Sequence, residues 1–324
     1  MEQRPLEYTV KIYCEGFTEW YYFEWLRTNN RFKFSMEPDI PKNSRSSYKQ
    51  NLKLIDKELR KNPQERADAI FLVIDTDTLV KNKAQYAIYQ EAKEKYKKQG
   101  VIFIESHPCI EIWFLYHLMD KFARTNFETY EALRPAIENV LPKYEKTARY
   151  YQKNSLFRES ILKSQTNREK AIDFSIKACK YEPIEKEIAN YTEVFKAIHF
   201  FRLLQKFAEI RLLLAEKLRT NVAIQPNVAS HKSLAIMHNE DMICTLKYSG
   251  TILKCIFGDG QTFDVDDTKP LDIEDSIIGY IAEIIKYLHI SSSSSRRLPI
   301  LLLQNIAGKS MGLLSDGQKC KDTL

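Results

Sequence analysis

The chain has 324 residues, 44% hydrophobic and 28% charged, a composition that excludes wholesale disorder and allows a packed core in two domains of ordinary size. Its formal net charge of +6 permits contact with a polyanion but does not demand it. The first residues lack the apolar run of a signal peptide, and no segment reaches about 18 uninterrupted apolar residues, so we expect no secretion leader and no contact with a membrane.

Cysteine usage indicates a reducing compartment. The six cysteines are far apart and form no Cys-x-x-Cys pair. In a chain of this length they are typical of free thiols, not of a disulfide framework. We therefore expect a cytoplasmic protein.

The first part of the chain alternates strands with helices. Apolar or alternating segments predict strands at residues 8–13, 32–36, 69–74 and 101–104. Helical patterns follow each of them, at residues 18–27, 46–59, 83–98 and 109–119. This order implies an α/β fold with a mostly parallel sheet sandwiched by helices. Such sheets bind ligands beyond the carboxyl ends of their strands.

The rest of the chain has a different, α+β character. Its patterns predict helices at residues 122–180 and 191–218, a β-hairpin at 242–257, a short strand after 260 and a helix at 273–288. Five consecutive serines at 291–295 indicate a linker that leads to a flexible tail. We expect three regions, at residues 1–170, 171–290 and 291–324.

Acidic residues follow two of the predicted strands at the point where each strand ends. Glu15 follows the first strand, Gly16 breaks that strand, and Glu19 lies one helical turn further on. Asp75 and Asp77 follow the third strand, and their spacing of two places both on one side of an extended stretch. We expect the four carboxylates to converge at one edge of the sheet.

Converging carboxylates raise one another's pKa, and a divalent cation removes that repulsion. Oxygen ligands in a loosely shaped site favour Mg²⁺ or Mn²⁺ over zinc, and two such ions can support phosphodiester cleavage. The Asp-x-Asp segment and the glutamate in the first helical turn, each taken alone, also have a purely structural interpretation. An Asp-x-Asp after a strand is often a helix cap or turn, and the helix dipole favours a glutamate in the first turn. The two patterns in this order favour the metal site.

Three blocks, YCEGFTEWYYFEWL, FLVIDTDT and SHPCIEIWFLYHL, resemble the signature blocks of the RloB-like family, in the same order and over roughly residues 8–170. That family is similar to the TOPRIM domains of topoisomerases, primases and overcoming-lysogenization-defect nucleases. The resemblance implies a TOPRIM-like sheet and a metal-dependent attack on a nucleic-acid backbone. RloB-like proteins are typically associated with phage-defence operons, often beside a partner ATPase.

The resemblance also implies roles for single residues. Glu15 matches the TOPRIM signature glutamate, a general acid/base or metal ligand, and Glu19 matches the second glutamate of the nuclease-type variant. Asp75 and Asp77 match the metal-binding Asp-x-Asp. Glu111 matches an acidic residue of the third block, although the residue before it is isoleucine where the family commonly has phenylalanine.

Other polar residues have two open interpretations each. Glu111 lies in an apolar helix, where a buried carboxylate needs either an ion pair with a lysine or arginine or a metal. His107 either contacts a phosphate or is an ordinary loop histidine. Lys42, Arg45 and Lys49 form a basic loop that either holds backbone phosphates or is simply solvated.

A basic series at residues 143–163 is interleaved with Tyr144, Tyr150 and Tyr151. It predicts either a nucleic-acid face with stacking aromatic rings or a solvated helix face.

The sequence as a whole favours a Mg²⁺-dependent TOPRIM-type nuclease that cleaves DNA or RNA, transfer RNA included, as an effector in antiphage defence of the abortive-infection type.

The expected catalytic residues are Glu15, Asp75, Asp77 and Glu19. The expected metal ligands are the same four with Glu111, and the expected nucleic-acid contacts are Lys42, Arg45, Lys49 and His107. A partner ATPase and a homo-oligomer are the expected assemblies. One alternative is a non-catalytic metal-binding module that partners a defence ATPase; another is a primase-like polymerase, although the chain shows no basic nucleotide pocket.

Overall fold

The computed structural model describes residues 8–29, 32–37, 47–180, 189–219, 222–226, 232–238, 240–269, 271 and 276–291. The predicted basic-loop residues Lys42 and Arg45, and the tail from residue 292 onward, lie outside these ranges. The chain divides into two compact units, residues 1–201 with 228–231 and residues 202–227 with 232–324. The predicted region limits at residues 170 and 290 remain predictions.

The first unit is built on a five-stranded sheet in the order β2-β1-β3-β4-β5. Its strands are β1 (Val10–Tyr13), β2 (Ser35–Glu37), β3 (Ala69–Asp75), β4 (Val101–His107) and β5 (Tyr191–Thr192). The first four are parallel, and β5 runs antiparallel to β4. The predicted α/β class with a mostly parallel sheet is therefore confirmed.

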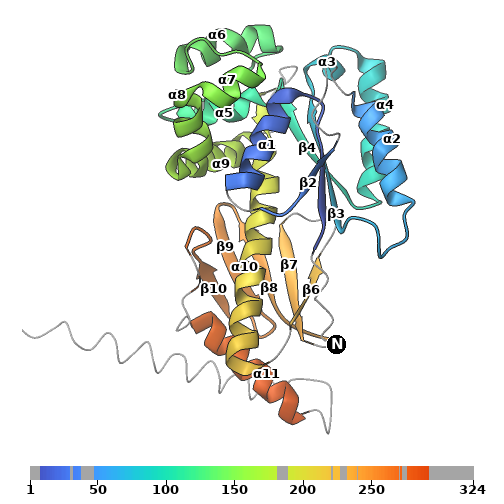
Figure 1. Ribbon diagram of the computed structural model, residues 1–324, viewed down its shortest axis with the longest axis vertical. Helices are drawn as coiled ribbons and strands as arrows, with labels where there is room; N and C mark the ends of the chain where they lie inside the picture. Colours follow the sequence, from blue (N-terminus) through green and yellow to red (C-terminus); the bar gives the residue numbers. More distant parts are fainter. Residues whose placement is uncertain are drawn as a thin grey trace, which may run out of the picture. The chain divides into compact units, whose positions relative to one another are not determined.

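Helices cover both faces of this sheet (Figure 1). The described helices of this unit before α10 (Val194–Leu218) are α1 (Phe17–Asn29), α2 (Tyr48–Leu59), α3 (Asp77–Val80), α4 (Lys83–Lys97), α5 (Glu111–Leu118), α6 (Tyr130–Val140), α7 (Ala148–Lys153), α8 (Ser155–Phe157), the π-helix η1 (Arg158–Lys163) and α9 (Gln165–Lys180). Helices α2 and α4 lie on one face, where Leu52, Ile55 and Tyr89 pack in one core with Ile70 and Leu72 of β3.

Strand β3 is central because its side chains are apolar on both faces. Every residue from Ala69 to Ile74 is buried, and each isoleucine, leucine, valine or phenylalanine side chain buried in this way stabilises the fold by about 1.5–3 kcal/mol. On the face opposite α2 and α4, the Phe71 ring lies 5.2 Å from the Phe200 ring and 5.9 Å from the Phe201 ring. Both phenylalanines belong to helix α10, whose residues from Arg202 onward belong to the second unit.

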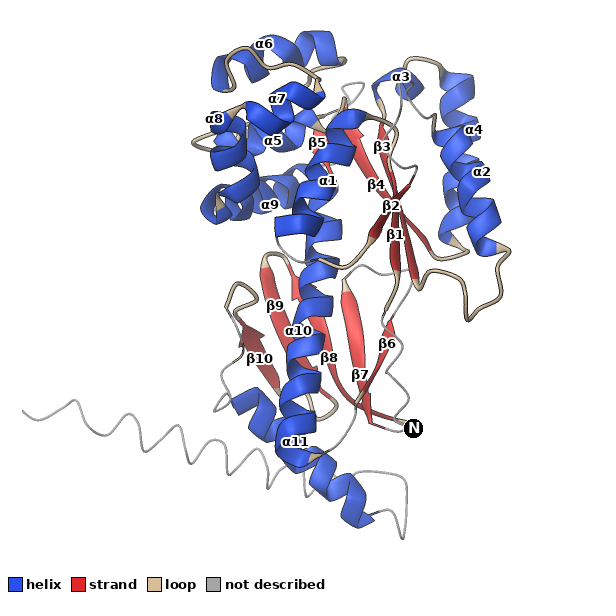
Figure 2. Cartoon of the chain, in the orientation of Figure 1, coloured by secondary structure: helices blue, strands red, loops and turns tan. Residues whose placement is uncertain are grey.

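The second unit contains an antiparallel sheet in the order β10-β9-β8-β7-β6, drawn with its helices in Figure 2. Its strands are β6 (Ala223–Pro226), β7 (Ser233–His238), β8 (Asp241–Ser249), β9 (Ile252–Phe257) and β10 (Thr262–Val265). The predicted hairpin is β8–β9, and Gly250, with φ of 65°, lies in its two-residue turn. Helix α11 (Ser276–Ser291) packs on the sheet, with the Tyr280 ring 4.6 Å from the Phe257 ring.

The length and charge of the described helices can be compared with what a membrane-spanning helix requires. The longest, α10, has 25 residues, and charged residues occur along its length. Within the described part of the chain, no helix combines the length and the apolar character that crossing a bilayer requires.

Candidate metal centre

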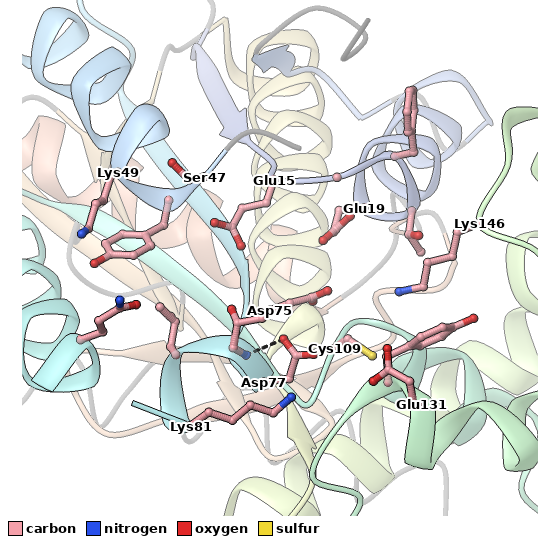
Figure 3. Close-up of a pocket in the computed structure, with 18 residues that line it drawn as sticks. Glu15, Glu19, Ser47, Lys49, Asp75, Asp77, Lys81, Cys109, Glu131 and Lys146 are labelled. Atoms are coloured by element: carbon pink, nitrogen blue, oxygen red, sulfur yellow. Dashed lines mark hydrogen bonds between the residues drawn. The ribbon is translucent and has the colours of Figure 1, made fainter. Parts of the chain in front are cut away.

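The predicted acidic residues meet at one cavity of the first unit, beyond the carboxyl ends of β1 and β3. The cavity has a volume of about 760 Å³, and Glu15, Glu19, Asp75 and Asp77 all line it. Figure 3 shows their carboxylates around the same space. Segments about 60 positions apart in the sequence are brought together here because β1 and β3 are neighbouring parallel strands.

A close backbone approach explains the glycine between the two glutamates. Glu19 lies in the first turn of α1, and its side chain is 3% exposed. A Cβ atom at Gly16 would lie 2.8 Å from Glu19 Oε2, closer than two such atoms can pack. Glycine at this position therefore leaves room for the Glu19 carboxylate at the cavity.

The Asp-x-Asp segment has a different geometry from the predicted one. Strand β3 ends at Asp75, Thr76 has a helical conformation, and Asp77 is the first residue of α3. The expectation that both aspartates lie on one side of an extended stretch is therefore wrong, although both line the cavity. The two are also fixed differently. Asp77 Oδ1 accepts the backbone N–H of Thr78 at 2.6 Å, and Asp75 Oδ1 accepts that of Ile110 at 2.9 Å.

Burial and the charges of neighbouring acids disfavour the charged forms of Glu15 and Asp75. Burial, followed by the nearby charge of Glu19, raises the pKa of Glu15 to about 8. Burial and the charges of Glu19 and Glu111 raise the pKa of Asp75 well above its usual range, and the ammonium of Lys146 opposes that rise. A cation in the cavity would relieve this repulsion.

Glu111 combines an ion pair with a position beside the cavity. It begins α5 and is fully buried. Its Oε1 accepts the hydroxyl of Tyr144 at 2.9 Å and lies 2.9 Å from Lys146 Nζ. Lys146 lines the cavity, and its ammonium lies 3.7 Å above the ring of Tyr130. Of the two interpretations of Glu111, the structure therefore shows the ion pair with a lysine.

Cys109 is a residue to which the sequence analysis assigned no role. Its Sγ, an oxygen of Asp75 and an oxygen of Glu111 all lie within 4.8 Å of one another, and the three could hold a metal ion. Burial, followed by the charges of Glu111 and Asp75, raises the pKa of the Cys109 thiol. The available signal was its place two residues before Glu111, where β4 leads into α5.

Of the predicted nucleic-acid contacts, Lys49 lies at the cavity and His107 does not. Lys49 is exposed and lines the cavity. His107 is 2% exposed and is not among the cavity-lining residues, and burial lowers its pKa to about 4. Its Nδ1 lies 3.0 Å from Thr76 Oγ1, and its ring stacks on Tyr191.

The tyrosines of the basic series are not available for stacking with bases. Tyr144, Tyr150 and Tyr151 are buried, so the interpretation of their rings as a stacking surface is wrong. Two of them support Glu111 instead. The Tyr144 and Tyr151 hydroxyls are 2.8 Å apart, and the Tyr151 hydroxyl lies 2.8 Å from Thr18 Oγ1.

Comparison with known proteins points to a family. A family model described as RloB-like protein matches residues 10–200, which is more than half of the chain and includes every carboxylate of the cavity. No curated protein and no solved structure matches the chain.

Proposed function

Because the chain belongs to the RloB-like family, we propose that it is a Mg²⁺-dependent nuclease of the TOPRIM type. The observation that carries the proposal is the meeting of Glu15, Glu19, Asp75 and Asp77 at one cavity beyond the strand ends. Such a cluster of acids, in which burial and neighbouring charges raise the pKa of Glu15 and of Asp75, is typical of a functional site.

The donor set fits a hard divalent cation. Glu15, Asp75 and Asp77 would hold Mg²⁺ or Mn²⁺ through carboxylate oxygens, and Glu19 would assist. The chemistry that such a cation supplies is activation of a water and neutralisation of charge on a phosphodiester. Without a cation Glu15 is neutral near pH 7, because its pKa is about 8, and a bound cation would favour the ionised form that serves as a ligand.

Basic residues at the same cavity support an anionic substrate. Lys49 and Lys81 are exposed and line it, and we assign them to contacts with backbone phosphates. Together with the net charge of +6, they favour DNA or RNA, transfer RNA included. We further propose an effector role in antiphage defence in the cytoplasm, with activity controlled by a partner ATPase or by self-association.

A cleavage assay tests the nuclease. The purified chain is incubated with plasmid, single-stranded DNA and total RNA, with Mg²⁺, with Mn²⁺ and with EDTA, and with and without a partner ATPase. We expect cleavage that requires the metal and falls at least about a hundredfold in Asp75→Asn and Asp77→Asn, since even residues that only support ligands have effects approaching this size. Asp120→Asn, which changes an exposed aspartate outside the cavity, is the matched control. Inertness in every condition with metal binding retained would overturn the proposal and favour a non-catalytic metal-binding module.

A further inference from the structure

The group formed by Asp75, Cys109 and Glu111 differs in chemistry from the four carboxylates of the proposed nuclease site. It contains a sulfur donor, and two of its three members are fully or almost fully buried. All three come from the ends of neighbouring parallel strands, since Asp75 ends β3 and the other two follow β4. The group is therefore carried by the ends of two hydrogen-bonded strands of the first unit.

The second oxygen of Glu111 points to a missing ligand. Oε1 is held by Tyr144 and Lys146, whereas Oε2 is buried and accepts no hydrogen bond from a nitrogen or oxygen donor of the described residues. The Cys109 thiol lies within hydrogen-bonding reach of this carboxylate. A buried carboxylate oxygen without a partner is unfavourable. A carboxylate with one oxygen fixed by neighbours and the other open is also the usual arrangement of a metal ligand with its supporting shell.

The three donors lie close enough for one cation. Ligand atoms around a tetrahedral metal with one sulfur and two oxygen donors are separated by about 3.5 Å. The donor atoms of the group lie within 4.8 Å of one another, so an inward shift of about an ångström completes the coordination. Asp75 is held through Oδ1 by Ile110 N–H at 2.9 Å, which fixes the carboxylate beside the other two donors.

We propose that Asp75, Cys109 and Glu111 form a second cation site, which takes a thiophilic divalent cation of the Zn²⁺ class and leaves its fourth position open. A thiolate is a soft ligand that favours such cations over Mg²⁺. On binding, the S–H bond of Cys109 breaks, a sulfur–metal bond forms and the proton passes to solvent, so no oxidant or reductant is needed. The site shares Asp75 with the proposed nuclease site but does not depend on the nuclease reaction.

Cadmium binding tests this site, because a sulfur–cadmium bond gives an ultraviolet charge-transfer band. The measurement uses the full chain with Cys179→Ser, Cys320→Ser, Cys244→Ala and Cys255→Ala. Cys179 is exposed, Cys320 lies outside the described residues, and the Cys244 and Cys255 thiols are hydrogen-bonded to each other and can bind cadmium as a pair. We expect a band that saturates at one Cd²⁺ per chain and survives excess Mg²⁺. Cys109→Ser should abolish it. Cys14→Ser is the matched control, because Cys14 is also buried among these acids but lies outside the group. No band in the parent chain, or an unchanged band in Cys109→Ser, would overturn the proposal.

Two measurements keep the test decisive if Cys109→Ser fails to fold. The ¹¹³Cd resonance of the parent chain should fall in the range of mixed sulfur and oxygen ligands, and a resonance in the all-oxygen range would refute the site. Glu15→Gln should keep the cadmium band and lose metal-dependent cleavage. Cleavage in the parent chain without the band would refute only this inference, and the band without cleavage would refute only the nuclease.

Discussion

Replacement of Lys146 by methionine isolates the electrostatic balance beside the cavity. The ammonium of Lys146 lies 2.9 Å from Glu111 Oε1, and the exposed fractions of the two side chains are 26% and 0%. Methionine keeps an unbranched apolar side chain of similar length but removes the charge. The Lys146→Met variant therefore leaves the Glu111 carboxylate buried without its cation.

The expected loss of stability follows from this burial. Removing one partner of a buried ion pair costs about 3–5 kcal/mol, because the other charge remains uncompensated. Water reaches Lys146, which is a quarter exposed, and Tyr144 still donates its hydrogen bond to Glu111, so we expect the smaller loss of about 2–4 kcal/mol. In a unit of this size, that loss lowers the melting temperature by roughly 5–12 °C.

Thermal unfolding of the full chain in EDTA measures this effect. Lys81→Met is the matched control, since Lys81 lines the same cavity but is exposed, and its replacement should change stability by less than about 0.5 kcal/mol. Mn²⁺ should raise the melting temperature of Lys146→Met more than that of the parent chain, because a divalent cation restores the missing charge. If Lys146→Met melts within about 1 °C of the parent in EDTA, the ion pair does not support Glu111 and the reasoning fails.

Three further predictions concern Glu15, Gly16 and Gly279. Without metal, Glu15 stays neutral in the folded chain up to about pH 8 but ionises near pH 4.5 in the unfolded chain, so the free energy of unfolding should decrease as pH rises through this range. Denaturant titrations should show a shallower decrease for Glu15→Gln, and equal slopes would contradict the raised pKa. Gly16→Ala should displace the Glu19 carboxylate and weaken Mn²⁺ binding about tenfold in calorimetric titrations. Gly258→Ala, whose added Cβ meets nothing within 4 Å, should bind as the parent does, and equal affinity of both variants would refute the steric argument. Gly279→Ala should stabilise α11 by about 0.5–1 kcal/mol, because its Cβ also meets open space and alanine favours the helix; a lower melting temperature would contradict this.

Local patterns predicted the main elements of the first unit because its strands and helices bury whole faces. The continuous apolar run of β3 is the pattern of a central strand, and Ser47 caps α2 by accepting the backbone N–H of Gln50. The two-residue strand β5 was missed because it exists only through its pairing with β4. Strands β6 and β7 were also missed; they are short and depend on hydrogen bonds to each other and to β8.

The sequence by itself determined that carboxylates follow β1 and β3, and that parallel strands would carry both sets to one edge. These conclusions depend only on hydrophobic period and on the position of each acid relative to a strand end. Only the tertiary structure decided that Lys146 faces Glu111, that Cys109 joins Asp75, and that the tyrosines of the basic series are buried. Such contacts join side chains from segments far apart in the chain, and their distances are set by how the helices pack on the sheet, which local periodicity does not encode.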